Sequence, residues 1–75
     1  MAQLPVLSGR EVVRALSQAG WQMARQRGSH MILVKDGHMA TLSVPDHREL
    51  AKGTLRSLIR SSGLSVDEFL HLLGK

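Results

Sequence analysis

Apolar residues recur at helical spacing in three segments of the chain, and this pattern predicts three helices. The first is expected over residues 9–19, the second follows a polar connection and ends at Gly63, and the third follows Ser65 and ends at Gly74. A glycine after each segment is typical of a helix end, because it tolerates the left-handed conformation found there. The apolar stripes are Val12, Val13, Leu16 and Ala19 in the first helix, Leu55, Leu58 and Ile59 in the second, and Leu70, Leu72 and Leu73 in the third.

Two of the three helix starts carry a capping box. Ser8 is followed three residues later by Glu11, and Ser65 is followed three residues later by Glu68. In this arrangement the serine hydroxyl and the glutamate carboxylate each accept a hydrogen bond from a backbone N–H of the first turn. We therefore expect helices to begin directly after Ser8 and Ser65.

Between the first two helices the pattern changes to the alternation of β-strands, which we predict over residues 21–27, 30–35 and 41–44. The dipeptides Gly28-Ser29 and Asp36-Gly37 have the composition of hairpin turns. Pro45 is expected to end the third strand because it has no N–H for the ladder. The chain thus predicts three antiparallel strands joined by two hairpins.

Side-chain alternation divides the second strand between two faces of this sheet. His30, Ile32 and Val34 fall on one face, whereas Met31, Leu33 and Lys35 fall on the other. Leu42 and Val44 of the third strand are expected to pack under the helices, which leaves Thr41 and Ser43 on the uncovered face with His30. Ile32 and Val34 are then apolar residues left open for another molecule to cover.

The element order predicts a two-layer α+β domain with the helices on one face of the sheet. A chain of 75 residues is too short to divide into two cores, so residues 1–75 are expected to form one domain. The net charge is +4, and seven of the ten basic residues are arginine. Because guanidinium groups match phosphate geometry, a polyanionic partner is the first expectation.

The chain contains no cysteine, and neither a signal peptide nor a membrane-length apolar run is found. Disulfides and thiolate metal sites are therefore excluded, and a cytoplasmic protein that does not bind membranes is expected.

The candidate chemistry lies where the first predicted hairpin turn meets the second strand, at Gly28, Ser29 and His30. Glycine permits close approach of a ligand, serine offers a hydroxyl, and histidine is the residue type that exchanges a proton most readily near neutral pH. Arg25 and Arg27 precede them and could hold a phosphate. The structural alternative is an ordinary histidine at a strand end that only satisfies the turn.

Gly28-Ser29-His30, Val44-Pro45-Asp46-His47, Lys52-Gly53-Thr54-Leu55-Arg56 and Gly63-Leu64-Ser65 occur in the order and spacing of one family. With these motifs, the chain resembles the HicA toxins over about residues 8–73. The resemblance implies a double-stranded-RNA-binding-domain-like fold, cleavage of mRNA, and inhibition by a HicB antitoxin. It also implies that His30 is catalytic. Many members carry a second histidine after this one, whereas Met31 stands here, so no paired-histidine role is transferred.

Cleavage of RNA needs no metal, because the 2′-hydroxyl is an internal nucleophile. His30 could act as general base or as general acid, and both roles stay open. The cations nearest in sequence are Arg25, Arg27 and Lys35, while Lys52 is a further candidate for RNA phosphates. The RNA-binding residues expected from the sequence are Gly28, Ser29, Arg25, Arg27, Lys35 and Lys52.

Neither a metal nor another cofactor is expected, because the four histidines are scattered and no carboxylate cluster accompanies them. His38 and His71 are interpreted as solvated surface and Trp21 as core, while the role of His47 stays open.

Two other function classes are retained. One is a double-stranded-RNA-binding module that never cuts, and the other is a pure interaction protein. For the toxin, the expected antitoxin interface is the face with His30, Ile32 and Val34, and DNA is not an expected target.

Overall fold

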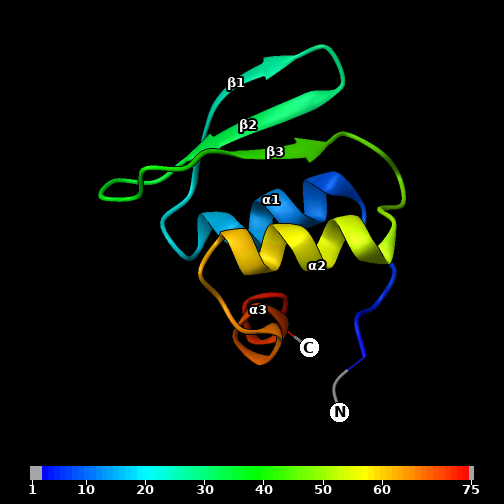
Figure 1. The fold of residues 1–75 in the computed structure, drawn as a ribbon. Helices are drawn as coiled ribbons and strands as arrows, with labels where there is room; N and C mark the ends of the chain where they lie inside the picture. The colour runs from blue at the N-terminus through cyan, green and yellow to red at the C-terminus, as the bar shows by residue number, and fades with distance from the viewer. Residues whose placement is uncertain (1–2, 75) are drawn as a thin grey trace.

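The computed structural model describes residues 3–74, and Figure 1 shows three strands on one side of two helices with a third helix beyond them. This order of helix, three antiparallel strands and helix confirms the predicted α+β architecture. The elements are α1 (Gly9–Ser17), β1 (Gln22–Arg27), β2 (His30–Val34), β3 (Leu42–Pro45), α2 (Lys52–Ser61) and α3 (Val66–Leu72).

The observed elements differ from the predicted ones mainly at their ends. Helix α1 ends at Ser17 and not at residue 19, and Trp21, Lys35 and Thr41 lie outside the strands. Pro45 is the last residue of β3, where it pairs with His30. A proline is accepted there because β3 is an edge strand and the position is its end.

Both predicted capping boxes are present. In α1 the Ser8 hydroxyl accepts from the Glu11 N–H at 3.1 Å, and the Glu11 carboxylate accepts from the Ser8 N–H at 2.9 Å. Ser65 and Glu68 make the same two hydrogen bonds at the start of α3. Helix α2 begins at Lys52, and the residue before it, Ala51, provides no side-chain cap.

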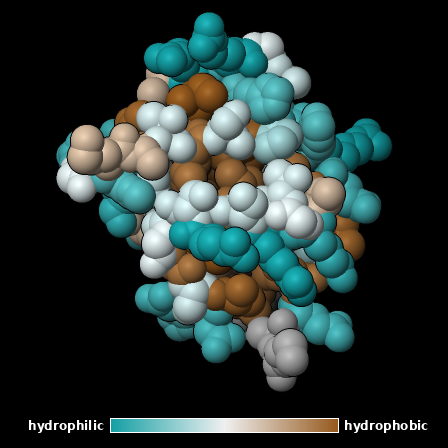
Figure 2. All heavy atoms as spheres, in the orientation of Figure 1, coloured by the Kyte–Doolittle hydropathy of each residue, from teal (hydrophilic) through white to brown (hydrophobic). Residues whose placement is uncertain are grey.

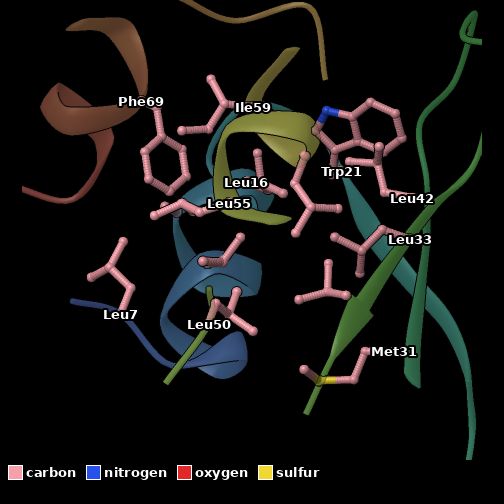
Figure 3. Packing of buried hydrophobic residues seen from close by; sticks show 14 of the residues in the cluster. Leu7, Leu16, Trp21, Met31, Leu33, Leu42, Leu50, Leu55, Ile59 and Phe69 are labelled. Carbon is pink, nitrogen blue, oxygen red and sulfur yellow. The ribbon is translucent and has the colours of Figure 1, made fainter. Parts of the chain in front are cut away.

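The core lies between the sheet and the helices. Met31, Leu33 and Leu42 point from the strands toward the helices, where Leu16 and Leu55 are buried (Figure 3). On β2 these buried residues alternate with the exposed or half-buried His30, Ile32 and Val34, which confirms the predicted faces of this strand. The predicted core position of Trp21 is also confirmed, since it is almost fully buried.

Gly9 is the point where α1 approaches the strands most closely. A Cβ atom at this position would lie 1.9 Å from the Pro45 carbonyl oxygen and 3.2 Å from the Met31 Cε atom. The backbone here is further tied by a hydrogen bond of 2.9 Å from the Gly9 N–H to the His47 carbonyl. Glycine is therefore needed for space at the start of α1, and its backbone angles are those of an ordinary helix.

Gly9→Ala is expected to lower the free energy of unfolding by about 1–3 kcal/mol, because overpacking against backbone outweighs the better helix propensity of alanine. Gly53→Ala is the matched control, since nothing lies within 4 Å of a Cβ at that helical position. The control should be neutral or stabilising by up to about 1 kcal/mol. Urea unfolding measures both, and equal effects of the two substitutions would contradict the steric argument.

Candidate functional site

The turn between β1 and β2 presents His30 at the first position of β2. Gly28 has a φ of +57°, whereas no other residue type in the described chain has a positive φ. Glycine at the first central position of a two-residue hairpin is the arrangement of a type II′ turn. The turn residues and His30 are all exposed. The sequence motif Gly28-Ser29-His30 thus forms an open corner of the sheet.

The register of β1 brings two arginines to the His30 side of the sheet. Arg27 pairs directly with His30, and Arg25 pairs with Ile32. Residues opposite each other in an antiparallel pair project from the same face, with Cβ atoms about 4.5–5.5 Å apart. His30, Arg27 and Arg25 therefore share one face, and Figure 2 shows hydrophilic surface over β1.

Strand β1 contains an irregularity just before these arginines. Met23 pairs with Leu33, yet the next pair in the ladder joins Arg25 to Ile32, so Ala24 is an extra residue. Such a β-bulge shifts the pairing on one side of it by one residue relative to the other side. The two-residue turn fixes the pairs of Arg25 and Arg27, so the bulge changes the residues before it. Without the bulge, Met23 would stand opposite Val34 on the His30 side and not opposite the buried Leu33. The sequence pattern predicts a regular strand and gives no sign of this bulge.

Apolar and small residues continue the face of the sheet that carries His30. Ile32 is half-buried, and Val34 keeps 38% of its surface exposed. On β3, Ser43 pairs with Ile32, and Pro45 pairs with His30. We call this surface the open face and define it by Arg25, Arg27, His30, Ile32 and Val34.

The two lysines expected in the RNA site lie apart from His30. Lys35 follows the far end of β2, and its side chain lies against Gly20, where a Cβ would be 3.3 Å from the Lys35 Cε atom. Lys52 is the exposed first residue of α2, at the end of the sheet where β3 finishes (Figure 1). The structure thus groups the two arginines with His30 and leaves Lys35 outside the group.

An ion pair that the sequence pattern does not reveal lies behind the turn. The Arg10 guanidinium donates to both carboxylate oxygens of Asp46, at 3.1 and 3.2 Å. The Arg10 hydrogen bond is the largest cause that holds the pKa of Asp46 below its ordinary value, and the same pair raises the pKa of Arg10. The two residues are 36 positions apart, so only the folded chain brings them together.

The remaining aromatic and histidine residues are partly as predicted. His71 is exposed on α3, as expected from the sequence. The expectation of a solvated His38 is wrong, because its half-buried ring packs against Trp21 with 4.8 Å between ring centroids. His47 is exposed.

Two kinds of feature are absent from residues 3–74. Within this range no three His, Asp or Glu side chains come together in a way that could hold a metal ion. The same part of the chain contains no helix long and apolar enough to cross a membrane.

Comparison with known proteins identifies a matching family and a similar solved structure. A family model described as the HicA toxin of bacterial toxin-antitoxin matches residues 9–64. A chain of a toxin-antitoxin complex from Streptococcus pneumoniae superposes with a TM-score of 0.70 and 32% sequence identity, covering 77% of this chain and 98% of that one. The comparison with curated proteins finds no match.

Proposed function

We propose that this chain, which belongs to the HicA family of bacterial toxins, is an endoribonuclease that cleaves mRNA with His30 as its catalytic residue. The observation that carries the proposal is the pairing of Arg27 with His30 on an exposed sheet face. A proton-transfer group and a cation side by side can together promote cleavage of a phosphodiester. The site of action would be the cytoplasm, where mRNA is found.

In the proposed reaction the 2′-hydroxyl of the RNA attacks the adjacent phosphorus, and the 5′-oxygen of the next nucleotide leaves. His30 either takes the proton of the attacking hydroxyl or gives a proton to the leaving oxygen. Arg27, with Arg25 next to it on the open face, would stabilise the negative charge that develops on the phosphoryl oxygens. The exposed Gly28-Ser29 turn leaves room for the RNA backbone to approach. No cofactor takes part.

Lys52 is proposed to contact RNA phosphates outside the reacting group, because it is exposed at the same end of the sheet. Lys35 is not part of the proposed site, because its side chain lies against Gly20 at the other end of β2.

The antitoxin is the second proposed partner. A HicB-type antitoxin would bind the open face and cover His30, and this is supported by the apolar Ile32 and Val34 beside the two arginines. The chain from Streptococcus pneumoniae belongs to a toxin-antitoxin complex, which supports an antitoxin partner here.

Purified protein mixed with RNA in EDTA tests the proposed reaction. Cleavage is expected to persist, and the products should carry 2′,3′-cyclic phosphate or 3′-phosphate ends. A matched RNA with one 2′-deoxynucleotide at the cleavage position should resist at that position, because it lacks the nucleophile. Loss of activity in EDTA with recovery on adding a divalent ion, or 5′-phosphate products, would show that water is activated in another way.

The alternative function is RNA binding without cleavage, and the exposed arginines of β1 are the feature that favours it. The same experiment separates the two. Protein that shifts RNA in a gel but leaves it intact, at any ion concentration, would support the binding module.

A further inference from the structure

Asp46 lies where β3, the β1–β2 turn and α1 meet. Its backbone N–H donates to the Ser29 carbonyl at 2.6 Å. Its carboxylate accepts from Arg10 of α1 and also from the Gln26 side-chain amide at 3.3 Å. The same Gln26 amide donates to the Gly28 carbonyl at 3.2 Å. Asp46 is thereby tied to both peptide carbonyls of the turn, one directly and one through Gln26.

These contacts lie on the side of the sheet opposite to His30. Gln26 pairs with Met31, which is buried under the helices, so the Gln26 side chain projects toward the helix side. From β1 it reaches Asp46, directly after the end of β3, and so spans the start of β2. Asp46 therefore cannot touch a ligand on the open face, and its effect on such a ligand has to pass through the turn.

Apart from the ladder pairs Arg27–His30 and His30–Pro45 beside it, the turn has little else to hold it. All six residues of β1 are exposed, so this edge strand contributes no buried side chain to the core. A Cβ at Gly28 would meet no atom within 4 Å, so side-chain packing does not support the turn at that position either. Beyond those ladder pairs, the described hydrogen bonds that join the turn to β3 and α1 run through Asp46, which binds the Ser29 carbonyl directly and the Gly28 carbonyl through Gln26.

We propose that Asp46 is a positioning residue, which orients His30 by fixing the Gly28-Ser29 turn from the helix side of the sheet. The inference rests on the proposed ribonuclease function. His30 is the first residue after the turn, so a displaced turn displaces the imidazole relative to Arg27 and to the scissile phosphate. A misplacement of about 1 Å can lower a rate by roughly a hundredfold.

Loss of the carboxylate charge should affect position more than global folding. The Arg10 side chain is 73% exposed, and exposed ion pairs contribute little to stability. The backbone hydrogen bond from Asp46 to Ser29 does not depend on the side chain and stays in an asparagine variant. Asp46→Asn should therefore yield a folded protein with a less ordered turn.

The test compares Asp46→Asn with Asp36→Asn, which removes the same charge in the β2–β3 loop, where no described contact depends on it. Asp46→Asn is expected to lower kcat for RNA cleavage by about tenfold or more and to change KM by less than about twofold. Gln26→Ala should lower kcat in the same way, and Asp36→Asn should leave kcat unchanged. A kcat for Asp46→Asn equal to that of wild type would overturn the inference.

A second measurement does not depend on activity. Backbone NMR of the free proteins should show shifted and exchange-broadened amide signals for residues 28–30 in Asp46→Asn, and unchanged signals there in Asp36→Asn. Unchanged signals in both variants would also overturn the positioning role. If wild type does not cleave RNA, the proposed function fails, and the NMR comparison still decides whether Asp46 orders the turn.

Discussion

His30→Ala is expected to remove most RNA cleavage and to abolish growth arrest while the protein stays folded. General acid-base catalysis by a histidine is worth about 100-fold to 10,000-fold, so cleavage should fall by this amount. His30 is exposed at a strand end and contributes nothing to the core, so the melting temperature should hardly change. His71→Ala is the matched control, because it removes another exposed histidine, from α3.

Binding should respond to other residues than cleavage does. Arg27→Ala is expected to weaken RNA affinity and to lower the slope of log affinity against log salt by about one, because one phosphate contact is lost. His30→Ala should leave both quantities nearly intact. If His30→Ala melts the domain, or if it cuts RNA as fast as His71→Ala, then His30 has only a structural role.

Ile32→Asp and Val34→Asp are each expected to weaken antitoxin binding by at least about 2 kcal/mol, or roughly 30-fold. The reason is that a carboxylate on the open face loses its water when a partner covers it. In the free toxin the new side chain stays in water, and at position 32 it stands opposite Arg25, so the fold should tolerate it. Titration calorimetry measures affinity, and thermal melting measures stability.

Two control variants test whether the effect is specific to the open face. Met39 is fully exposed in the β2–β3 loop, outside the open face, so Met39→Asp should leave antitoxin affinity unchanged. Leu33→Asp places a charge in the core and should unfold the domain. An antitoxin that binds Ile32→Asp and Val34→Asp as tightly as wild type would have to dock on another surface of the toxin.

The parts of the fold that were predictable from the sequence depend on residues close together in the chain. The capping boxes of α1 and α3 involve residues three positions apart, and the faces of β2 follow from alternation within five residues. Each pattern records a local geometry that the folded protein keeps. The observed ends of the helices and strands differ from the predicted ends by only one to two residues.

The parts that were not predictable depend on contacts between distant segments. The Arg10–Asp46 ion pair joins the first helix to the segment after β3, and the reason for Gly9 is a carbonyl oxygen of Pro45. His38 is drawn from solvent by its contact with Trp21, which no local pattern encodes. The sequence therefore pointed to the residues proposed for catalysis and RNA binding. It did not point to Arg10 and Asp46, whose ion pair lies on the helix side of the turn.

The bulge at Ala24 has a consequence for how relatives of this toxin should be aligned. On either side of Ala24 the pairs are those of a regular strand that lacks this residue, with Met23 opposite Leu33 and Arg25 opposite Ile32. A relative with one residue fewer at this point can therefore pair as a regular strand and present the same side chains on each face. The bulge thus accommodates an insertion, and an alignment gap of one residue here leaves the arginines beside His30. A change in the length of the turn, which fixes Arg27 opposite His30, would instead move them to the other face.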